Sequence, residues 1–331
     1  MTSNPSCGVK VLGTGSAVPN NLLDNETLAE RFQVDRDWIE QRTGIRERRY
    51  CDDDEGTYEL QVRALKDALD STGMKGSDLD LIICATVTAE MTCPSNACRV
   101  AAAVDSKPAG AFDLVAACSG FVYAMNVADN LIRGGSYKTI AVVGCDAMSK
   151  LTDPNDRGTS ILFGDAGGAV ILQRCNDTSK GCFYQTMSAD GEPWPALYIP
   201  TCEKGVVEGD EATTEIGMLR MKGKEVYKFA VTKFQEITET LLNETGLTPD
   251  DVSQFICHQS NMRIIESAQT KLGLADEKVY KNIDLFGNSS AGAAALCFDQ
   301  LWKDGKMKDD DVIVMLAFGG GLTWSSSAWR I

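Results

Sequence analysis

The sequence predicts an α/β protein built from two similar halves, with helices covering the faces of mixed β-sheets. Three observations predict this fold. Strand-like apolar runs alternate with amphipathic, helix-like segments. Landmarks of the first half recur in the second at a nearly constant spacing. A polar run, RCNDTSKG at 174–181, separates the two sets of landmarks. We therefore expect an N-terminal half at 1–175 and a C-terminal half at 176–331.

The predicted elements follow the same order in both halves. In the first half they are a helix at 58–69, an acidic turn and strand at 78–84, a strand at 111–115, a helix ending near 133–135 and a strand at 139–144. In the second half they are a helix at 231–242, a turn and strand at 251–257, a helix ending near 303–305 and a strand at 312–319. Gly73 and Gly246, which each follow a helix, are 173 positions apart (246 − 73), as are Cys84 and Cys257 (257 − 84). Such a repeat is far longer than a solenoid unit. Two halves packed about a pseudo-dyad would bring equivalent loops to one central site.

Composition places the chain among ordinary globular proteins. Of its 331 residues, 44% are hydrophobic and 24% are charged, and the net charge is −15. This charge disfavours attraction to nucleic acid or to an anionic membrane. No apolar run approaches the roughly 18 residues of a membrane span. The segment Met1–Cys7 is polar and lacks a signal-peptide pattern, so we expect a cytoplasmic protein.

One local basic cluster departs from the acidic average. Five basic residues fall within 14 positions: Arg220, Lys222, Lys224, Lys228 and Lys233. The cluster is either a solvated helix face or a docking patch for an acidic partner.

The twelve cysteines and the single histidine limit the chemistry. A reducing compartment makes a disulfide framework unexpected. The chain has no Cys-x-x-Cys motif and cannot build a zinc site on a histidine pair, so we expect no metal. A thiol in a small-residue context, Cys118, together with a lone imidazole, His258, is a pattern typical of nucleophilic catalysis.

Each candidate site residue has a functional and a structural interpretation. Cys118 lies between a strand and a helix, where helix N–H groups favour a thiolate, but it could be a buried structural cysteine. His258 ends a strand and could be a hydrogen-bonded structural histidine. Asn288 follows a glycine and could cap a turn or helix. The run Gly319-Gly320-Gly321 is either a flexible turn or a backbone that must approach another group closely.

Six motifs together resemble those of β-ketoacyl-acyl-carrier-protein synthase III. They are WIEQRTGI (38–45), DLVAACSGF (113–121), DRGTSILFGD (156–165), HQSNMRI (258–264), GNSSA (287–291) and AFGGGLTW (317–324). The matches run in order from Gly13 to the C-terminus. The resemblance implies a thiolase-like fold of five layers, αβαβα, made of two duplicated halves, and usually a homodimer.

The resemblance also implies an acyltransferase that initiates fatty-acid synthesis. Acyl-CoA would acylate Cys118, and the backbone N–H groups of Cys118 and Gly320 would form the oxyanion hole. Decarboxylative Claisen condensation with malonyl-acyl-carrier protein would follow, with His258 and Asn288 donating hydrogen bonds to the malonyl thioester carbonyl. No cofactor is implied beyond CoA thioester and carrier-protein phosphopantetheine as substrates.

Further roles are carried over by position. The adenine of CoA would lie between Trp38 and Arg157, with Arg42 nearby, and Asn261 would order water or the pantetheine arm. The structural alternatives are core packing for Trp38, an ion pair with Asp156 for Arg157 and a helix cap for Asn261.

The resemblance also assigns the carrier protein and the acyl chain to surfaces of this chain. The residues expected to dock the carrier protein are Lys228, Arg263 and Lys271. Phe318 would shape the mouth of the acyl pocket, although it could be a core aromatic. Cys93 stands where many members have an aromatic that reaches into the partner subunit's acyl pocket. This smaller side chain predicts tolerance of longer or branched acyl primers.

Two other classes of function stay open. One is a relative that uses the same Cys-His-Asn site in secondary metabolism or condenses two acyl-CoAs. The other is a non-enzymatic redox sensor or scaffold with a reactive thiol. The lone histidine argues against elongating enzymes of the Cys-His-His type.

Overall fold

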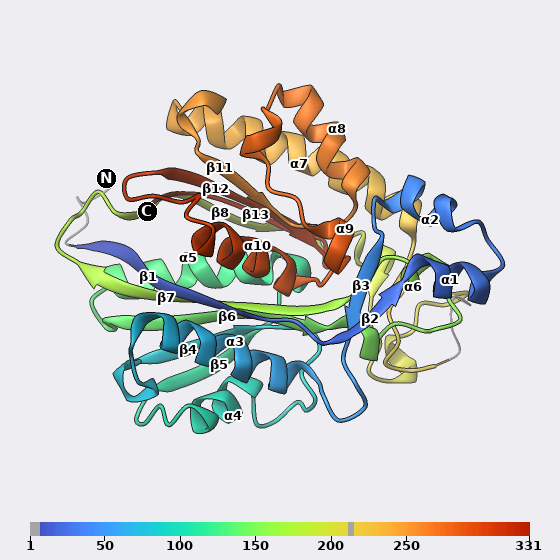
Figure 1. Ribbon diagram of the computed structural model, residues 1–331, viewed down its shortest axis with the longest axis horizontal. Coiled ribbons are helices and arrows are strands. Elements are labelled where there is room, and N and C mark those ends of the chain that lie inside the picture. The colour runs from blue at the N-terminus through green and yellow to red at the C-terminus, as the bar shows by residue number, and fades with distance from the viewer. Residues whose placement is uncertain (1–6, 211–214) are drawn as a thin grey trace.

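The computed structural model describes residues 7–210 and 215–331, so the N-terminal segment considered above lies largely outside the described residues. Five layers are visible edge-on in Figure 1, and they confirm the predicted αβαβα architecture. The layers are, in order, helices α7 (Gly223–Thr245) and α8 (Met262–Leu272), a four-stranded sheet, helices α5 (Gly120–Arg133) and α10 (Ala291–Lys303), a five-stranded sheet, and helices α3 (Thr57–Thr72) and α4 (Asn96–Ala103).

The five-stranded sheet takes all its strands from the first half of the chain. Its order is β1 (Gly8–Ala17), β7 (Asp165–Cys175), β6 (Thr139–Ala147), β4 (Leu81–Ala85) and β5 (Gly110–Leu114). Strand β4 is parallel to β5 and to the central strand β6, whereas β7 is antiparallel to β1 and β6. Helices cover both faces, which explains why β4 and β6 are apolar and buried along their length.

The four-stranded sheet repeats this arrangement in the second half. Its order is β11 (Gln254–Cys257), β12 (Val312–Gly319), β13 (Thr323–Arg330) and β8 (Gly181–Ala189). The pair β11 and β12 is parallel and the other pairs are antiparallel, as for β4, β6, β7 and β1. The counterpart of β5 is reduced to an isolated parallel bridge between Phe255 and Val279.

A smaller lobe lies at one end of the layers, on the right of Figure 1. Its elements are β2 (Asn21–Asp24), α1 (Asn25–Phe32), α2 (Arg36–Thr43), β3 (Glu47–Tyr50), α6 (Arg157–Ser160) and α9 (Ile283–Phe286), with the short pair β9 (Leu197–Tyr198) and β10 (Arg220–Met221) nearby. Arg48 is fully buried and donates to Asn25 Oδ1 at 2.9 Å and to the Ile161 carbonyl at 2.8 Å. These bonds connect the β2–β3 strand pair to the end of α6.

The central helix layer carries one core shared by both sheets. Small residues let α5 and α10 lie directly against the strands: a Cβ on Gly292 would come within 2.0 Å of the Ala166 carbonyl oxygen. Phe121 and Phe298 meet edge to face, with ring centroids 6.4 Å apart. Each large apolar side chain fully buried here contributes about 1.5–3 kcal/mol. This packing fixes the N-terminal ends of α5 and α10 at the centre of the molecule.

No helix within 7–210 and 215–331 combines the length and the apolar character needed to cross a bilayer.

Candidate active site

Cys118 lies at the tight turn between β5 and α5. Ala117, immediately before it, has φ 47°, in the left-handed region, and Ala117–Ser119 form a single 3-10 turn that leads into α5. The Cys118 side chain is 7% exposed. Burial raises the pKa of the Cys118 thiol to about 12 and outweighs the backbone hydrogen bond that lowers it. Burial therefore opposes the thiolate that the helix end is expected to favour.

Three side chains from distant parts of the chain meet in one cavity of about 310 Å³, here called the first cavity. They are Cys118, His258 and Asn288, separated by 140 (258 − 118) and 170 (288 − 118) positions in the sequence. Cys118 precedes α5, His258 follows β11, and Asn288 lies just before α10. The loops that end equivalent elements of the two halves therefore converge, as the repeat predicts.

His258 is held as a neutral imidazole. Its backbone N–H donates to the Leu316 carbonyl at 2.8 Å, which continues the β11–β12 pairing. The ring meets Phe318 edge-on, with centroids 5.6 Å apart. Burial lowers the pKa of His258 to about 3, because the charged form loses its hydration. At neutral pH the ring can donate one hydrogen bond and carries no charge.

Asn288 is oriented by its own backbone and that of Ser290. The backbone N–H of Asn288 donates to the Leu162 carbonyl at 2.8 Å, and the side-chain Oδ1 of Asn288 accepts from the backbone N–H of Ser290 at 2.9 Å. The turn role considered from the sequence is therefore present. Because Oδ1 is occupied, the side-chain NH2, which has no hydrogen bond to another described residue, is left to face a ligand in the first cavity.

The glycine run that begins at the last residue of β12 is required because its backbone passes close to the backbone of the Cys118 turn. A Cβ on Gly319 would lie 2.6 Å from the Cys118 nitrogen. The hydroxyl of Thr323, which follows the run, donates to the Ala116 carbonyl at 3.1 Å. The end of β12 is therefore pressed against the Cys118 turn, and Gly320 lies beside it.

A second cavity, of about 590 Å³, is also lined by Cys118. Most of its lining is apolar and includes Val87, Met91, Val115, Met148, Phe163, Leu197, Ile199 and Leu219. Phe318 lines the first cavity and not the second, so its predicted place at the mouth of the acyl pocket stays a prediction. Cys93 is exposed and does not line either of these cavities.

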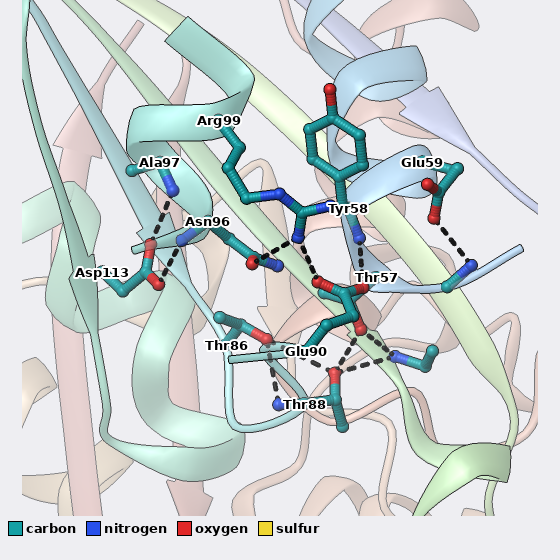
Figure 2. Close-up of polar contacts among 12 residues, drawn as sticks. Thr57, Tyr58, Glu59, Thr86, Thr88, Glu90, Asn96, Ala97, Arg99 and Asp113 are labelled. Atoms are coloured by element: carbon teal, nitrogen blue, oxygen red, sulfur yellow. Dashed lines mark hydrogen bonds and ion pairs between the residues drawn. The ribbon is translucent and has the colours of Figure 1, made fainter. Parts of the chain in front are cut away.

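One wall of the second cavity is the loop between β4 and α4, and a polar cluster anchors it (Figure 2). Glu90 accepts from the Tyr58 N–H at 2.8 Å and pairs with Arg99 at 2.9 Å. The Arg99 guanidinium lies 3.9 Å from the centre of the Tyr58 ring. Asp113 accepts from the first two N–H groups of α4 at 2.8 Å each. Sequence reasoning missed this cluster, since its members come from separate elements with no shared periodicity.

Three residues predicted to hold CoA lie together, and one of them, Arg42, lines the first cavity. The guanidinium carbons of Arg42 and Arg157 lie 4.8 Å and 5.1 Å from the centre of the Trp38 ring. Trp38 also packs against buried apolar side chains of α1 and α2, so its structural interpretation holds as well. Asp156 caps α6 by accepting from the Gly158 N–H and forms no ion pair with Arg157 in the described part of the chain.

Asn261 connects the cavity rim to α8. It caps this helix by accepting from the Arg263 N–H at 2.9 Å, and its side chain donates to the Arg42 carbonyl at 3.1 Å. It also lines the first cavity. The cap and the predicted position next to a ligand are therefore compatible.

The three residues predicted to dock a carrier protein are exposed on neighbouring helices. Lys228 lies on α7, and Arg263 and Lys271 lie on α8, which packs beside α7 at the top of Figure 1. Lys271 contacts Gln235 of α7.

Comparison with known proteins gives a consistent result. The family model of 3-oxoacyl-(acyl-carrier-protein) synthase III matches residues 112–191, and the model of its C-terminal part matches residues 242–331. The chain is 40% identical to a β-ketoacyl-(acyl-carrier-protein) synthase III of Caldanaerobacter subterraneus over 96% of each chain.

Solved structures agree with the sequence comparison. The crystal structure of 3-oxoacyl-(acyl-carrier-protein) synthase III from Aquifex aeolicus superposes with a TM-score of 0.90 at 38% identity, covering 98% of this chain and 100% of the other. The priming β-ketosynthase of the R1128 polyketide pathway reaches the same TM-score at 29% identity, covering 100% and 98%.

Proposed function

Because the chain belongs to the 3-oxoacyl-(acyl-carrier-protein) synthase III family, we propose that Cys118, His258 and Asn288 carry out its two half-reactions. The protein is a condensing acyltransferase that initiates fatty-acid synthesis. The observation that supports the residue assignment is the convergence of a thiol, a neutral imidazole and a carboxamide on one cavity. A redox sensor or scaffold would not need this convergence.

In the first half-reaction, the Cys118 sulfur attacks the thioester carbonyl of acyl-CoA. The new S–C bond forms as the C–S bond to CoA breaks, and CoA leaves as a thiolate that takes up a proton. The N–H groups of Cys118 and Gly320 hold the oxyanion of the tetrahedral intermediate. The close packing of Gly319 on the Cys118 nitrogen, next to Gly320 in the chain, supports this pairing.

In the second half-reaction, malonyl-carrier protein loses carbon dioxide and its enolate attacks the acyl group on Cys118. His258 and Asn288 donate hydrogen bonds to the thioester oxygen on which the charge develops. Donors that are uncharged before the reaction suit this step, because their hydrogen bonds stabilise the negatively charged enolate oxygen more than the neutral thioester oxygen. The low pKa of His258 keeps it in this form.

The two cavities divide the substrate between them. The first cavity is lined by Arg42, which contacts Trp38, and by Cys118, and it would hold the pantetheine arm, whereas the second would hold the acyl chain. The volume and apolar lining of the second cavity favour a primer longer than acetyl.

We expect octanoyl-CoA to acylate Cys118 at least as fast as acetyl-CoA when the two compete, as measured by intact mass. The reason is that a longer chain buries more apolar surface, at about 0.8 kcal/mol for each CH2 group. The variant Leu219→Phe, which narrows the second cavity, should reduce octanoyl transfer more than acetyl transfer. A wild-type preference for acetyl-CoA by orders of magnitude would contradict the assignment.

The variant Trp38→Ala should raise the KM for acyl-CoA roughly ten-fold or more and change kcat much less. Stacking of a base on an aromatic contributes about 1–3 kcal/mol. Steady-state kinetics would measure the effect. Acyl-N-acetylcysteamine, which has no adenine, serves as the control and should be used equally well by both enzymes. An equal loss with both substrates would show that Trp38 acts only through packing.

We further propose a cytoplasmic homodimer that docks acyl carrier protein on α7 and α8 and needs no cofactor besides its thioester substrates. The apolar Val115 and Phe112, 76% and 37% exposed, lie at or just beyond the free edge strand β5. A second copy on this edge would cover them and bring its Cys93 loop towards the second cavity. Exposed Lys228, Arg263 and Lys271 suit an acidic carrier.

A role in secondary metabolism is the second candidate, favoured by the likeness to the R1128 priming enzyme. Intact-mass measurement after acyl-CoA, followed by either malonyl-carrier protein or a second acyl-CoA, separates these functions. Condensation with the carrier substrate of fatty-acid synthesis supports the main proposal. Condensation only with a second acyl-CoA, or only with a dedicated polyketide carrier, would overturn it.

A further inference from the structure

Asp146 is a fully buried carboxylate in the apolar strand β6, where hydroxyl and backbone N–H groups surround it. Its Oδ1 accepts from the Thr86 hydroxyl and the Val87 N–H at 2.8 Å each, and from the Thr88 hydroxyl and N–H at 2.9 Å and 3.2 Å. Its Oδ2 accepts from the Ala291 N–H at 3.1 Å. A carboxylate is costly to bury unless such bonds satisfy it, so Asp146 and its donors hold one another in place.

The two oxygens of Asp146 bind two different parts of the site. The donors to Oδ1 belong to the loop between β4 and α4, in which Val87 lines the second cavity. The Thr88 hydroxyl is also hydrogen-bonded, at 2.6 Å, to the Thr57 hydroxyl at the start of α3 (Figure 2). The donor to Oδ2, Ala291, is the first residue of α10. Asp146 therefore connects one wall of the second cavity to the start of α10.

The start of α10 in turn orients Asn288. Ala291 follows Ser290, whose backbone N–H donates to Asn288 Oδ1 at 2.9 Å. Ser290 has φ 52°, a conformation that a non-glycine residue keeps only where its surroundings determine it. A Cβ on Gly144 would lie 2.7 Å from the Ala291 carbonyl oxygen. Gly144 and Asp146 are two residues apart on β6 and so face the same side, on which the helix begins.

We propose that Asp146 is a positioning residue for condensation, which holds the turn at Ser290 and Ala291 so that the Asn288 side-chain NH2 points into the first cavity. The same carboxylate keeps this turn in place relative to the loop beside the acyl chain. Asp146 does not line either of the two cavities, so it acts on the reaction through Asn288. The inference rests on the proposed role of Asn288 as a donor to the enolate.

The variant Asp146→Asn separates the two oxygens. An amide replaces one carboxylate oxygen with an NH2 group, which only donates. The amide oxygen should take the place of Oδ1, because four donors of the β4–α4 loop converge there. The NH2 group then faces the Ala291 N–H, so that two donors meet in place of a donor and an acceptor. The change should therefore loosen the start of α10 and leave the cavity wall in place.

The test compares two rates in wild type and in Asp146→Asn. Rapid mixing of acetyl-enzyme with malonyl-carrier protein measures condensation, and intact mass after acetyl-CoA measures acylation. We expect condensation to be about ten- to 100-fold slower in the variant, since a shift of about 1 Å in a reacting group can have an effect of this size. Acylation should stay close to the wild-type rate, because Asn288 has no part in it.

The matched control is Asp299→Asn, which changes another buried carboxylate close to the other end of α10. Asp299 accepts from the Thr14 hydroxyl at 2.7 Å. Because this bond touches neither the turn before α10 nor the β4–α4 loop, the control should keep both rates.

A double-mutant cycle shows whether Asp146 acts through Asn288. In the Asn288→Ala background, Asp146→Asn should slow condensation little further, because the donor that it positions is already absent. A merely structural role would give the same fold-loss in both backgrounds and would overturn the proposal.

Thr88→Val and Thr88→Ser carry the test if Asp146→Asn folds poorly. Valine keeps the shape of threonine and removes one hydroxyl donor to Oδ1, so condensation should slow, whereas serine keeps the hydroxyl and should restore the rate. Condensation as fast as in Asp299→Asn, by Asp146→Asn or by Thr88→Val in its place, would overturn the positioning role. A wild-type enzyme with no acyl adduct, or an Asn288→Ala enzyme that condenses at the wild-type rate, would instead overturn the proposed function.

Discussion

Replacement of Cys118 by alanine should abolish the covalent acyl adduct and reduce condensation by at least about three orders of magnitude. Loss of a nucleophile removes the covalent path as a whole, and what remains is substrate binding and the oxyanion donors. Intact mass after acyl-CoA treatment measures the adduct, and a β-ketoacyl-carrier assay measures turnover.

The matched control for this prediction is Cys202→Ser. Cys202 is exposed and contributes to neither cavity around Cys118, so this variant should keep both the adduct and turnover. An acyl adduct that persists in Cys118→Ala would assign the nucleophile to another of the twelve cysteines.

Replacement of His258 or Asn288 by alanine should separate the two half-reactions. Each change removes one donor to the enolate oxygen, which corresponds to about 2.7–4 kcal/mol or a 100- to 1,000-fold slower condensation. Acylation of Cys118 should continue, because neither side chain is assigned to remove its proton. Rapid mixing of acyl-enzyme with malonyl-carrier protein measures condensation, and intact mass measures acylation.

The control and the pH dependence sharpen this second prediction. Ser260 lines the same cavity and its hydroxyl is buried without a partner, so Ser260→Ala should be nearly silent. Because the pKa of His258 is about 3, its protonation should not slow condensation of pre-acylated enzyme between about pH 5 and pH 8. A loss of condensation centred near the ordinary histidine value of 6.5 would show that His258 is solvated and acts as a base.

Much of the fold could be predicted because its two halves share one pattern. Helix stops at Gly73 and Gly246 and strand ends at Cys84 and Cys257 mark corresponding positions, and the structure places their elements in corresponding layers. The same symmetry explains why Cys118 and Asn288, which precede the equivalent helices α5 and α10, share a cavity.

The parts that could not be predicted depend on packing between elements. Asp146 sits in an apolar strand, and its donors come from Thr86–Thr88 and Ala291, far away in the sequence. Nothing in a single sequence indicates which neighbours satisfy such a carboxylate. Which of the two cavities Phe318 lines depends likewise on how β12 meets β11. The raised pKa of the thiol follows from burial, which a helix-end argument leaves out.

The presence of two cavities that Cys118 lines has a kinetic consequence. In the proposed assignment, the acyl chain stays in the second cavity while the pantetheine arm of CoA leaves the first cavity and that of the carrier protein enters it. Acyl-CoA and malonyl-carrier protein must therefore bind one after the other. An excess of either substrate should inhibit the enzyme by occupying the form to which the other substrate binds. Double-reciprocal plots should be parallel at low concentrations and bend upward at high ones.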